Sequence, residues 1–255
     1  MSDKEDKKYE LGIALGGGGA RGFAHLGILQ ALYERDIKPD IISGVSAGAI
    51  AGAFIASGHT PEKAFEAIKD YNFTGISGLN IPKTGLLSSA KMKSKLLKKI
   101  PTKKMEDLEI PLIICVSNML DGKPEYMCEG PLATIVQASA SIPVLFSPVD
   151  INGKLYSDGG IFDNVPVKVL RKQCKKVIGV SISPIQEIKE LKSLIQVSAR
   201  MFQLAVNPST SELKSNCDVF IEPLDLCDYD IMDTKHAKEI YDIGYEHTKN
   251  MEINL

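Results

Sequence analysis

Residues 41–50 read Ile41-Ile42-Ser43-Gly44-Val45-Ser46-Ala47-Gly48-Ala49-Ile50, an apolar run followed by a G-x-S-x-G pattern and then by small residues. This order is typical of a nucleophile elbow, in which a sharp turn between a strand and a helix raises a serine above the end of a parallel sheet. Gly44 and Gly48 flank the serine because the strained turn leaves no room for a Cβ atom. An ordinary turn between strand and helix is the alternative, since a motif this short recurs by chance.

The chain around this stretch alternates predicted strands with predicted helices. Residues 10–15 form an apolar strand, a glycine loop follows, and apolar residues at helical spacing begin at Phe23. Asp40 precedes the short strand that leads into the elbow, and Thr60 before Pro61 is typical of a helix N-cap. Strands that alternate with helices predict a parallel sheet.

The later part of the chain continues this alternation. Strands are expected at 110–117, 124–127, 177–183 and 219–221, a hairpin at 149–156, an extended apolar loop at 141–148, and helices at 88–104, 131–140, after 164–166, at 187–205 and at 234–249. Residues 73–85 are rich in Gly, Asn, Pro and Ser, and together with the lysine-rich helix at 88–104 they are expected to be a mobile cover. Without internal repeats or a low-complexity linker, residues 10–255 are expected to form a single domain behind a flexible tail of residues 1–9.

The composition is that of an ordinary globular protein. Hydrophobic residues make up 44% of the 255 residues and charged residues 24%. The formal net charge of -2 gives no global field that favours nucleic acid as a partner. Five cysteines, odd in number and without a C-x-x-C pair, argue against a disulfide framework or a cysteine metal site. The N-terminus has no apolar stretch that could act as a signal peptide, so a cytoplasmic location is expected.

A second motif, Gly17-Gly18-Gly19-Ala20-Arg21-Gly22, fits G-x-G-x-x-G between a predicted strand and a predicted helix. In a Rossmann protein such a loop binds a dinucleotide, and an acidic residue about twenty positions further on holds the ribose. Asp40 has nearly that separation but precedes its strand, which favours a serine enzyme instead. If Ser46 attacks an acyl carbonyl, the backbone N–H groups of residues 17–19 can stabilise the oxyanion.

A serine nucleophile also needs a base. The four histidines are His25, His59, His236 and His247. None of them follows an acidic residue in an order typical of a hydrolase triad. The alternative to a catalytic role is an ordinary structural role for each. Asp158 lies in a glycine-flanked turn after a predicted strand, where a carboxylate can be presented in a cleft. We therefore expect Asp158 to be the general base. Arg21 either braces the glycine loop, binds a polar head group or is a surface arginine.

Taken together and in this order, the motifs resemble those of the patatin-like phospholipase family, in particular its single-domain bacterial members. Residues 17–22 are similar to that family's oxyanion loop, with Arg21 and Gly22 in support; Gly44-Val45-Ser46-Ala47-Gly48 is similar to its elbow and Asp158-Gly159-Gly160 to its dyad turn. Residues 138–143 and 146–148 also resemble the segment that the family places before its aspartate. The resemblance covers residues 10–250, with Gly160 where many members have alanine, a difference expected to be harmless.

The resemblance implies an α/β fold with three layers, α/β/α, around a mainly parallel central sheet, related to the α/β-hydrolase architecture. It also implies a serine lipid acyl hydrolase of phospholipase A, lysophospholipase or esterase type that needs no metal and no cofactor. Ser46 would carry the acyl group, and Asp158 would take its proton and then activate water. A phospholipid or another fatty-acyl ester is the expected substrate. The alternatives are a catalytically weak lipid-binding or regulatory member and, less favoured, a Rossmann nucleotide binder.

Lysines are concentrated near Leu96 and Leu97; they are Lys91, Lys93, Lys95, Lys98, Lys99, Lys103 and Lys104. A basic amphipathic helix of this kind can attach a protein to the surface of an anionic bilayer. A solvated helix face is the commoner explanation of such a run. Peripheral contact with the inner face of the membrane through Lys91–Lys104 is therefore one of two expectations for this segment.

Overall fold

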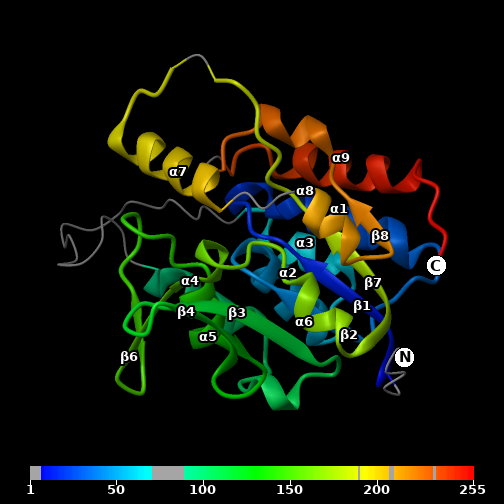
Figure 1. Ribbon diagram of the computed structural model, residues 1–255, viewed down its shortest axis with the longest axis horizontal. Helices are drawn as coiled ribbons and strands as arrows, with labels where there is room; N and C mark the ends of the chain where they lie inside the picture. Colours follow the sequence, from blue (N-terminus) through cyan, green and yellow to red (C-terminus); the bar gives the residue numbers. More distant parts are fainter. Residues whose placement is uncertain (1–6, 71–88, 189, 207–209, 232–233) are drawn as a thin grey trace.

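The computed structural model describes residues 7–70, 89–188, 190–206, 210–231 and 234–255. These residues form a central sheet of eight strands in the order β5-β6-β3-β2-β1-β7-β8, with β4 also paired to β3 (Figure 1). The strands are β1 (Tyr9–Leu15), β2 (Ile41–Gly44), β3 (Leu112–Asn118), β4 (Lys123–Met127), β5 (Val149–Ile151), β6 (Lys154–Asp158), β7 (Cys174–Val180) and β8 (Val219–Ile221). β1, β2, β3, β7 and β8 pair in parallel, whereas β4, β5 and β6 pair antiparallel. The mainly parallel sheet expected from the sequence is confirmed.

Helices cover both faces of this sheet and complete the predicted three layers. They are α1 (Phe23–Tyr33), α2 (Ala47–Ala56), α3 (Pro61–Ile68), α4 (Ala90–Lys99), α5 (Leu132–Ser139), α6 (Val167–Arg171), α7 (Leu194–Ala205), α8 (Thr210–Ser215) and α9 (Ala237–Lys249), with short 3-10 turns at Gly19–Gly22, Met105–Asp107, Gly159–Ile161 and Leu224–Asp228. Ile13 and Leu15 of β1 join the core beneath α1, α2 and α5, whereas Ala14 packs with α6 on the other face. Because strand side chains alternate between faces, a strand covered on both sides must be apolar throughout.

The C-terminal helix α9 closes the domain against α1. A Cβ atom on Gly27 of α1 would lie 2.0 Å from the Tyr241 carbonyl oxygen, and one on Gly244 of α9 would lie 2.4 Å from the Ala24 oxygen. The two glycines therefore allow the helix backbones to meet directly. The helix expected at 234–249 begins at Ala237, and one of its sides is packed rather than solvated.

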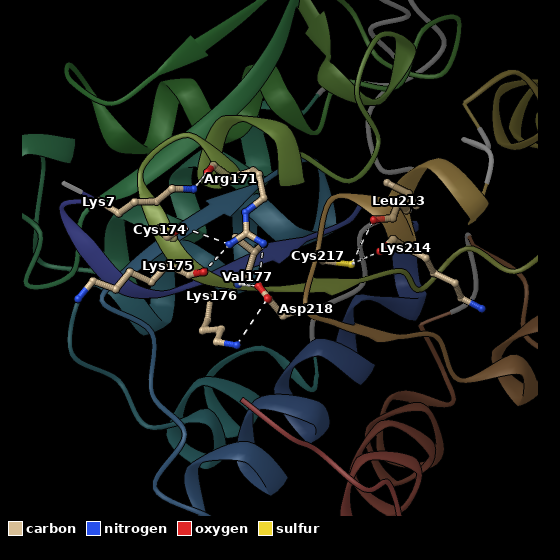
Figure 2. Close-up of polar contacts among 10 residues, drawn as sticks. All are labelled: Lys7, Arg171, Cys174, Lys175, Lys176, Val177, Leu213, Lys214, Cys217 and Asp218. Atoms are coloured by element: carbon tan, nitrogen blue, oxygen red, sulfur yellow. Dashed lines mark hydrogen bonds and ion pairs between the residues drawn. The ribbon is translucent and has the colours of Figure 1, made fainter. Parts of the chain in front are cut away.

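A charged cluster fastens the start of β7 to β8 and to the N-terminal segment (Figure 2). Arg171 Nη1 donates to Asp218 Oδ2 at 2.8 Å, and Lys176 Nζ lies 3.7 Å from Asp218 Oδ1. Lys7 Nζ donates to the Arg171 carbonyl oxygen at 2.5 Å. Residues 1–6 of the predicted tail lie outside the described residues, whereas Lys7 is held by this contact and β1 already begins at Tyr9.

Helix α7 is shorter than the sequence suggests and lies at the end of the molecule away from both termini (Figure 1). The predicted helix begins at residue 187, but α7 begins at Leu194. Ser193 Oγ accepts the Gln196 N–H at 3.2 Å and so caps the helix. Arg200 Nη2 binds the Gln186 carbonyl oxygen at 2.6 Å, which draws the preceding segment back alongside the helix instead of extending it.

The loop expected to be extended at 141–148 contains a turn. The Phe146 N–H donates to the Ile142 carbonyl oxygen at 2.9 Å, and Val144 between them has a φ of 68°. Proline at position 143 therefore does not keep this loop extended. Helix α8 is a further element that the sequence patterns do not indicate.

Other expectations can be compared directly. The antiparallel β4, the β5–β6 hairpin and the Thr60 cap of α3 are confirmed; Thr60 Oγ1 accepts the Lys63 N–H at 3.3 Å. All five cysteines are free thiols, as expected. Of the predicted cover, residues 73–88 lie outside the described residues, and the lysine-rich helix α4 ends at Lys99 instead of residue 104. Within the described ranges, helices long and apolar enough to cross a bilayer are absent.

Candidate active site

Ser46 lies at the sharp turn between β2 and α2, with φ 53° and ψ -118°. This backbone conformation is rare for a residue with a side chain and costs about 1–3 kcal/mol, so the surroundings must hold it in place. The Ser46 N–H donates to Ser139 Oγ at 3.0 Å, and Ser139 Oγ in turn donates to the Cys115 carbonyl oxygen at 2.7 Å. Ser139 thus ties the elbow to β3, a role that the sequence did not reveal.

The glycines around the three motifs lie where backbones meet. A Cβ atom on Gly44 would lie 2.7 Å from the Gly48 carbonyl oxygen, and one on Gly48 would lie 2.0 Å from the Leu15 oxygen. A Cβ atom on Gly22 would lie 2.7 Å from Ala47 Cβ, and one on Gly159 would lie 2.2 Å from the Cys115 oxygen. Real Cβ atoms do not approach other atoms this closely, because packed interiors cannot absorb such overlaps. The elbow and the aspartate turn are therefore fixed against the sheet by direct backbone contact, and the glycine loop lies against the Ala47 side chain at the start of α2.

Asp158 ends β6 and has 0% of its surface exposed. Its Oδ1 accepts the Gly160 N–H at 2.9 Å. Burial raises the pKa of the carboxyl group from 3.8 to about 7, although the nearby Ser46 hydroxyl and the Gly160 N–H act to lower it. Among the described residues Oδ2 meets no donor in standard hydrogen-bond geometry. The Ser46 hydroxyl therefore lies beside the carboxylate without a fully formed hydrogen bond, as is common before substrate binds.

The glycine loop reaches the same place. A Cβ atom on Gly17 would lie 3.3 Å from Ser46 Cβ, so the loop runs directly beside the serine. The Gly17 N–H donates to the Asn164 carbonyl oxygen at 3.0 Å and is already occupied. The N–H groups of Gly18 and Gly19 have no acceptor within the described residues. Of the three predicted oxyanion donors, Gly18 and Gly19 are thus available, whereas Gly17 fixes the loop.

Asn164 links the loop to the aspartate turn, and sequence reasoning missed it. Its Oδ1 atom lies 2.5 Å from the position of a Cβ on Gly17 and 2.9 Å from that of a Cβ on Gly160. Because residue 160 is glycine, the Asn164 side-chain amide can lie beside it without a clash. An alanine at this position would require the Asn164 side chain to move. The sequence offered only Asn164-Val165-Pro166 as a helix start, and nothing in this pattern indicates a contact with the glycine loop.

Arg21 braces the site from behind. Only 4% of its surface is exposed, so it is not a surface arginine. Its Nε, Nη1 and Nη2 atoms donate to the carbonyl oxygens of Tyr229, Pro184 and Cys227 at 2.8, 3.0 and 3.3 Å. Burial lowers the pKa of the guanidinium group to about 10, and the three carbonyls compensate its charge. Bracing is therefore the role that the structure supports, because the guanidinium donors are used within the protein.

His25, His59 and Asp40 have structural contacts of their own. His25 Nε2 lies 2.7 Å from the Gly16 carbonyl oxygen, and burial lowers the pKa of this ring to about 4, so it is neutral. His59 contacts Ser57 at 3.1 Å. Asp40 Oδ2 accepts the backbone N–H groups of residues 10 and 11, at the beginning of β1, whereas the glycine loop lies at its end. The acid that a Rossmann site needs is therefore at the wrong edge of the sheet.

Comparison with known proteins adds a family. The model of the family described as Patatin-like phospholipase matches residues 13–171. An uncharacterized NTE family protein of Mycobacterium tuberculosis is 33% identical over 159 residues, which cover 62% of this chain and 44% of that protein. Lysophospholipase NTE1 of Saccharomyces cerevisiae is 24% identical over 271 residues, which cover 93% of this chain and 16% of that protein. The chain thus spans less than half the length of these curated relatives.

Among solved structures, VipD of Legionella pneumophila matches with a TM-score of 0.58 at 18% identity, covering 94% of this chain and 66% of that chain. At this identity the likeness shows the fold alone. The family match covers more than half of the chain and includes the glycine loop, the Ser46 elbow and the Asp158 turn. The chain belongs to the patatin-like phospholipase family.

Proposed function

We propose that the chain is a serine lipid acyl hydrolase of phospholipase A, lysophospholipase or esterase type, with Ser46 as nucleophile and Asp158 as general base. The observation that carries this proposal is the buried Asp158 carboxyl group beside the Ser46 hydroxyl, with its pKa raised to about 7. A group with such a pKa can both accept and return a proton near neutral pH. The yeast relative is named a lysophospholipase, which supports the same class of substrate.

The first half of the reaction forms an acyl-enzyme. Ionised Asp158 accepts the Ser46 proton while Ser46 Oγ attacks the ester carbonyl carbon. The negative charge that develops on the carbonyl oxygen is stabilised by the Gly18 and Gly19 N–H groups, each worth about 3–4 kcal/mol of barrier. The tetrahedral intermediate then expels the alcohol, which takes the proton from Asp158.

The second half releases the fatty acid. Asp158, ionised again, removes a proton from a water molecule that attacks the acyl carbonyl carbon. The oxyanion is stabilised at the same two N–H groups, and Ser46 leaves with the proton held by Asp158. Every proton step uses one carboxyl group, so the proposed mechanism needs no histidine.

A fluorophosphonate probe tests the nucleophile directly. Such probes phosphonylate activated serines, so we expect stoichiometric labelling that is lost in Ser46→Ala, because the hydroxyl that attacks phosphorus is gone. Ser57→Ala is the matched control: it removes a serine hydroxyl that donates to the Phe54 carbonyl oxygen at 2.9 Å, at the C-terminal end of α2, and leaves the elbow unchanged, so it should still be labelled. Absence of labelling in the parent protein, or labelling that persists in Ser46→Ala, would contradict the assignment. A lipid-binding member without turnover and a nucleotide binder both predict no labelling.

Peripheral membrane contact through the lysine-rich segment is a further part of the proposal. Lys98 and Lys99 of α4 are exposed, and each lysine near an anionic surface is worth about 1 kcal/mol. We expect Lys98→Gln/Lys99→Gln to weaken co-sedimentation with phosphatidylglycerol vesicles by about tenfold or more. Lys172→Gln/Lys214→Gln, with the same change of charge at exposed positions away from α4, should leave it unaltered. Binding that ignores both salt and anionic lipid would favour a solvated helix face.

A further inference from the structure

A cavity of about 360 Å³ lies between α2, α3 and α4, close to the elbow. Its apolar lining comes from all three helices and consists of Ile50, Phe54, Ala67, Ile68 and Leu96. Cavities of this size, lined mainly by apolar side chains, are typical of sites for small molecules. The site described above does not account for this space.

The cavity lies on the side of α2 that faces away from the sheet. Gly48 and Gly52 face the sheet, since a Cβ on Gly52 would lie 3.1 Å from Leu112 Cδ1. Ile50 and Phe54 lie on the opposite side of the helix, one and two turns after Ser46. With a rise of 1.5 Å per residue, these two positions lie about 6 and 12 Å along the helix from the serine. The apolar wall therefore begins one turn from the proposed nucleophile and leads away from it.

The charges at the rim carry both signs. Glu66 and Asp70 lie on the side of α3, and Lys95, Lys98 and Lys99 on the side of α4. A rim of mixed sign does not select strongly for one ionic group, whereas the apolar lining favours an uncharged hydrocarbon. The ligand that fits this lining best is an unbranched hydrocarbon chain.

We propose that this cavity holds the acyl chain of the ester whose carbonyl group is attacked by Ser46. This inference rests on the proposed function. It adds where the acyl chain binds and how binding depends on the length of that chain. A methylene group moved from water into an apolar lining strengthens binding about fourfold, so substrates should improve with chain length as they extend along Ile50 and Phe54.

Filling the cavity should change this preference. Ala67 is half-buried in the lining, and in Ala67→Trp the indole would occupy the space. We expect kcat/KM for p-nitrophenyl dodecanoate to fall about tenfold or more relative to p-nitrophenyl butanoate, whose short chain does not reach so far. Ala205→Trp is the matched control, because Ala205 lines a different cavity of about 270 Å³ beside Gly160. This control should keep the parent ratio of the two substrates.

A second measurement does not depend on turnover. The chain contains no tryptophan, so Phe54→Trp places a single fluorophore in the cavity wall. Brominated dodecanoic acid should quench its emission, and should not quench the indole of Ala205→Trp. An unchanged substrate ratio in Ala67→Trp, or equal quenching at both positions, would overturn the inference while leaving the proposed function intact. If the parent protein hydrolyses neither ester but the quenching is selective, the proposed function fails and the chain site stands.

Discussion

Replacing Asp158 with asparagine is expected to lower kcat for ester hydrolysis at least about a thousandfold. The amide cannot accept the Ser46 proton, whereas the N–H groups of Gly18 and Gly19 still stabilise the oxyanion and account for any residual rate. The same residue should set the pH dependence of the parent protein. Because only ionised Asp158 can act as the base and its pKa is about 7, kcat/KM should rise through about pH 7 and then become level. Initial rates with a p-nitrophenyl ester measure both effects.

The controls for this expectation use Ser46. Ser46→Ala should lose activity to a similar extent, and the double variant should lose no more than either single variant, because residues that act as a unit are not additive. A histidine base that does not depend on Asp158 would predict that Asp158→Asn retains most of its turnover. That result, or a profile that stays flat between about pH 5 and pH 9, would exclude Asp158 from the role of base.

The same Asp158→Asn variant is expected to be more stable than the parent protein at high pH. The carboxyl group has a pKa of about 7 in the folded chain and 3.8 as its ordinary value, so folding favours the protonated form. Its contribution is complete below pH 3.8 and is lost as pH rises to about 7. Asparagine stays neutral throughout, so the free energy of unfolding should exceed that of the parent by up to about 4 kcal/mol above pH 7, with little difference near pH 4.

Denaturant unfolding at both pH values measures this difference, and Ser46→Ala provides the comparison. Ser46→Ala keeps the buried carboxyl group and removes a hydroxyl that lowers its pKa, so its stability should fall with rising pH at least as much as that of the parent. The asparagine amide can keep the Gly160 N–H on its oxygen and direct its nitrogen to the Ser46 hydroxyl, which limits the loss of hydrogen bonds. Equal stability of Asp158→Asn and the parent protein at high pH would mean that burial of the ionised Asp158 carboxylate does not destabilise the fold. A buried carboxyl group that destabilises the fold at neutral pH is expected where that group is needed as a catalytic base, because active sites trade stability for function.

The sequence was sufficient for the sheet and for the position of the serine and the aspartate. Strands covered on both faces are apolar runs, and a G-x-S-x-G after such a run leaves few other geometries for the serine. Asp158 could be selected because glycines follow it directly at the end of a strand, a local pattern. In each case the residues that determine the conformation are neighbours in the chain.

The remainder of the site depends on contacts that are distant in the chain. Arg21 donates to three carbonyls between residues 184 and 229, and no local pattern distinguishes such an arginine from a surface one. Asn164 and Ser139 act through single atoms that fill gaps beside Gly17 and Ser46. The predicted start of α7, at residue 187, was wrong for a related reason. Apolar periodicity continues before Ser193, whereas the contact between Arg200 and Gln186 turns the chain there.

The order of the strands has a practical consequence for shortening the chain. The family match ends at residue 171, before β7, yet β7 pairs with β1 in the interior of the sheet and β8 pairs with β7. A protein cut at that boundary would expose the hydrogen-bonding edge of β1, the strand that carries the glycine loop, and an open apolar edge promotes aggregation. The same cut would also remove α9, whose backbone packs directly against Gly27 of α1. The smallest unit worth producing for the experiments above therefore extends through Lys249.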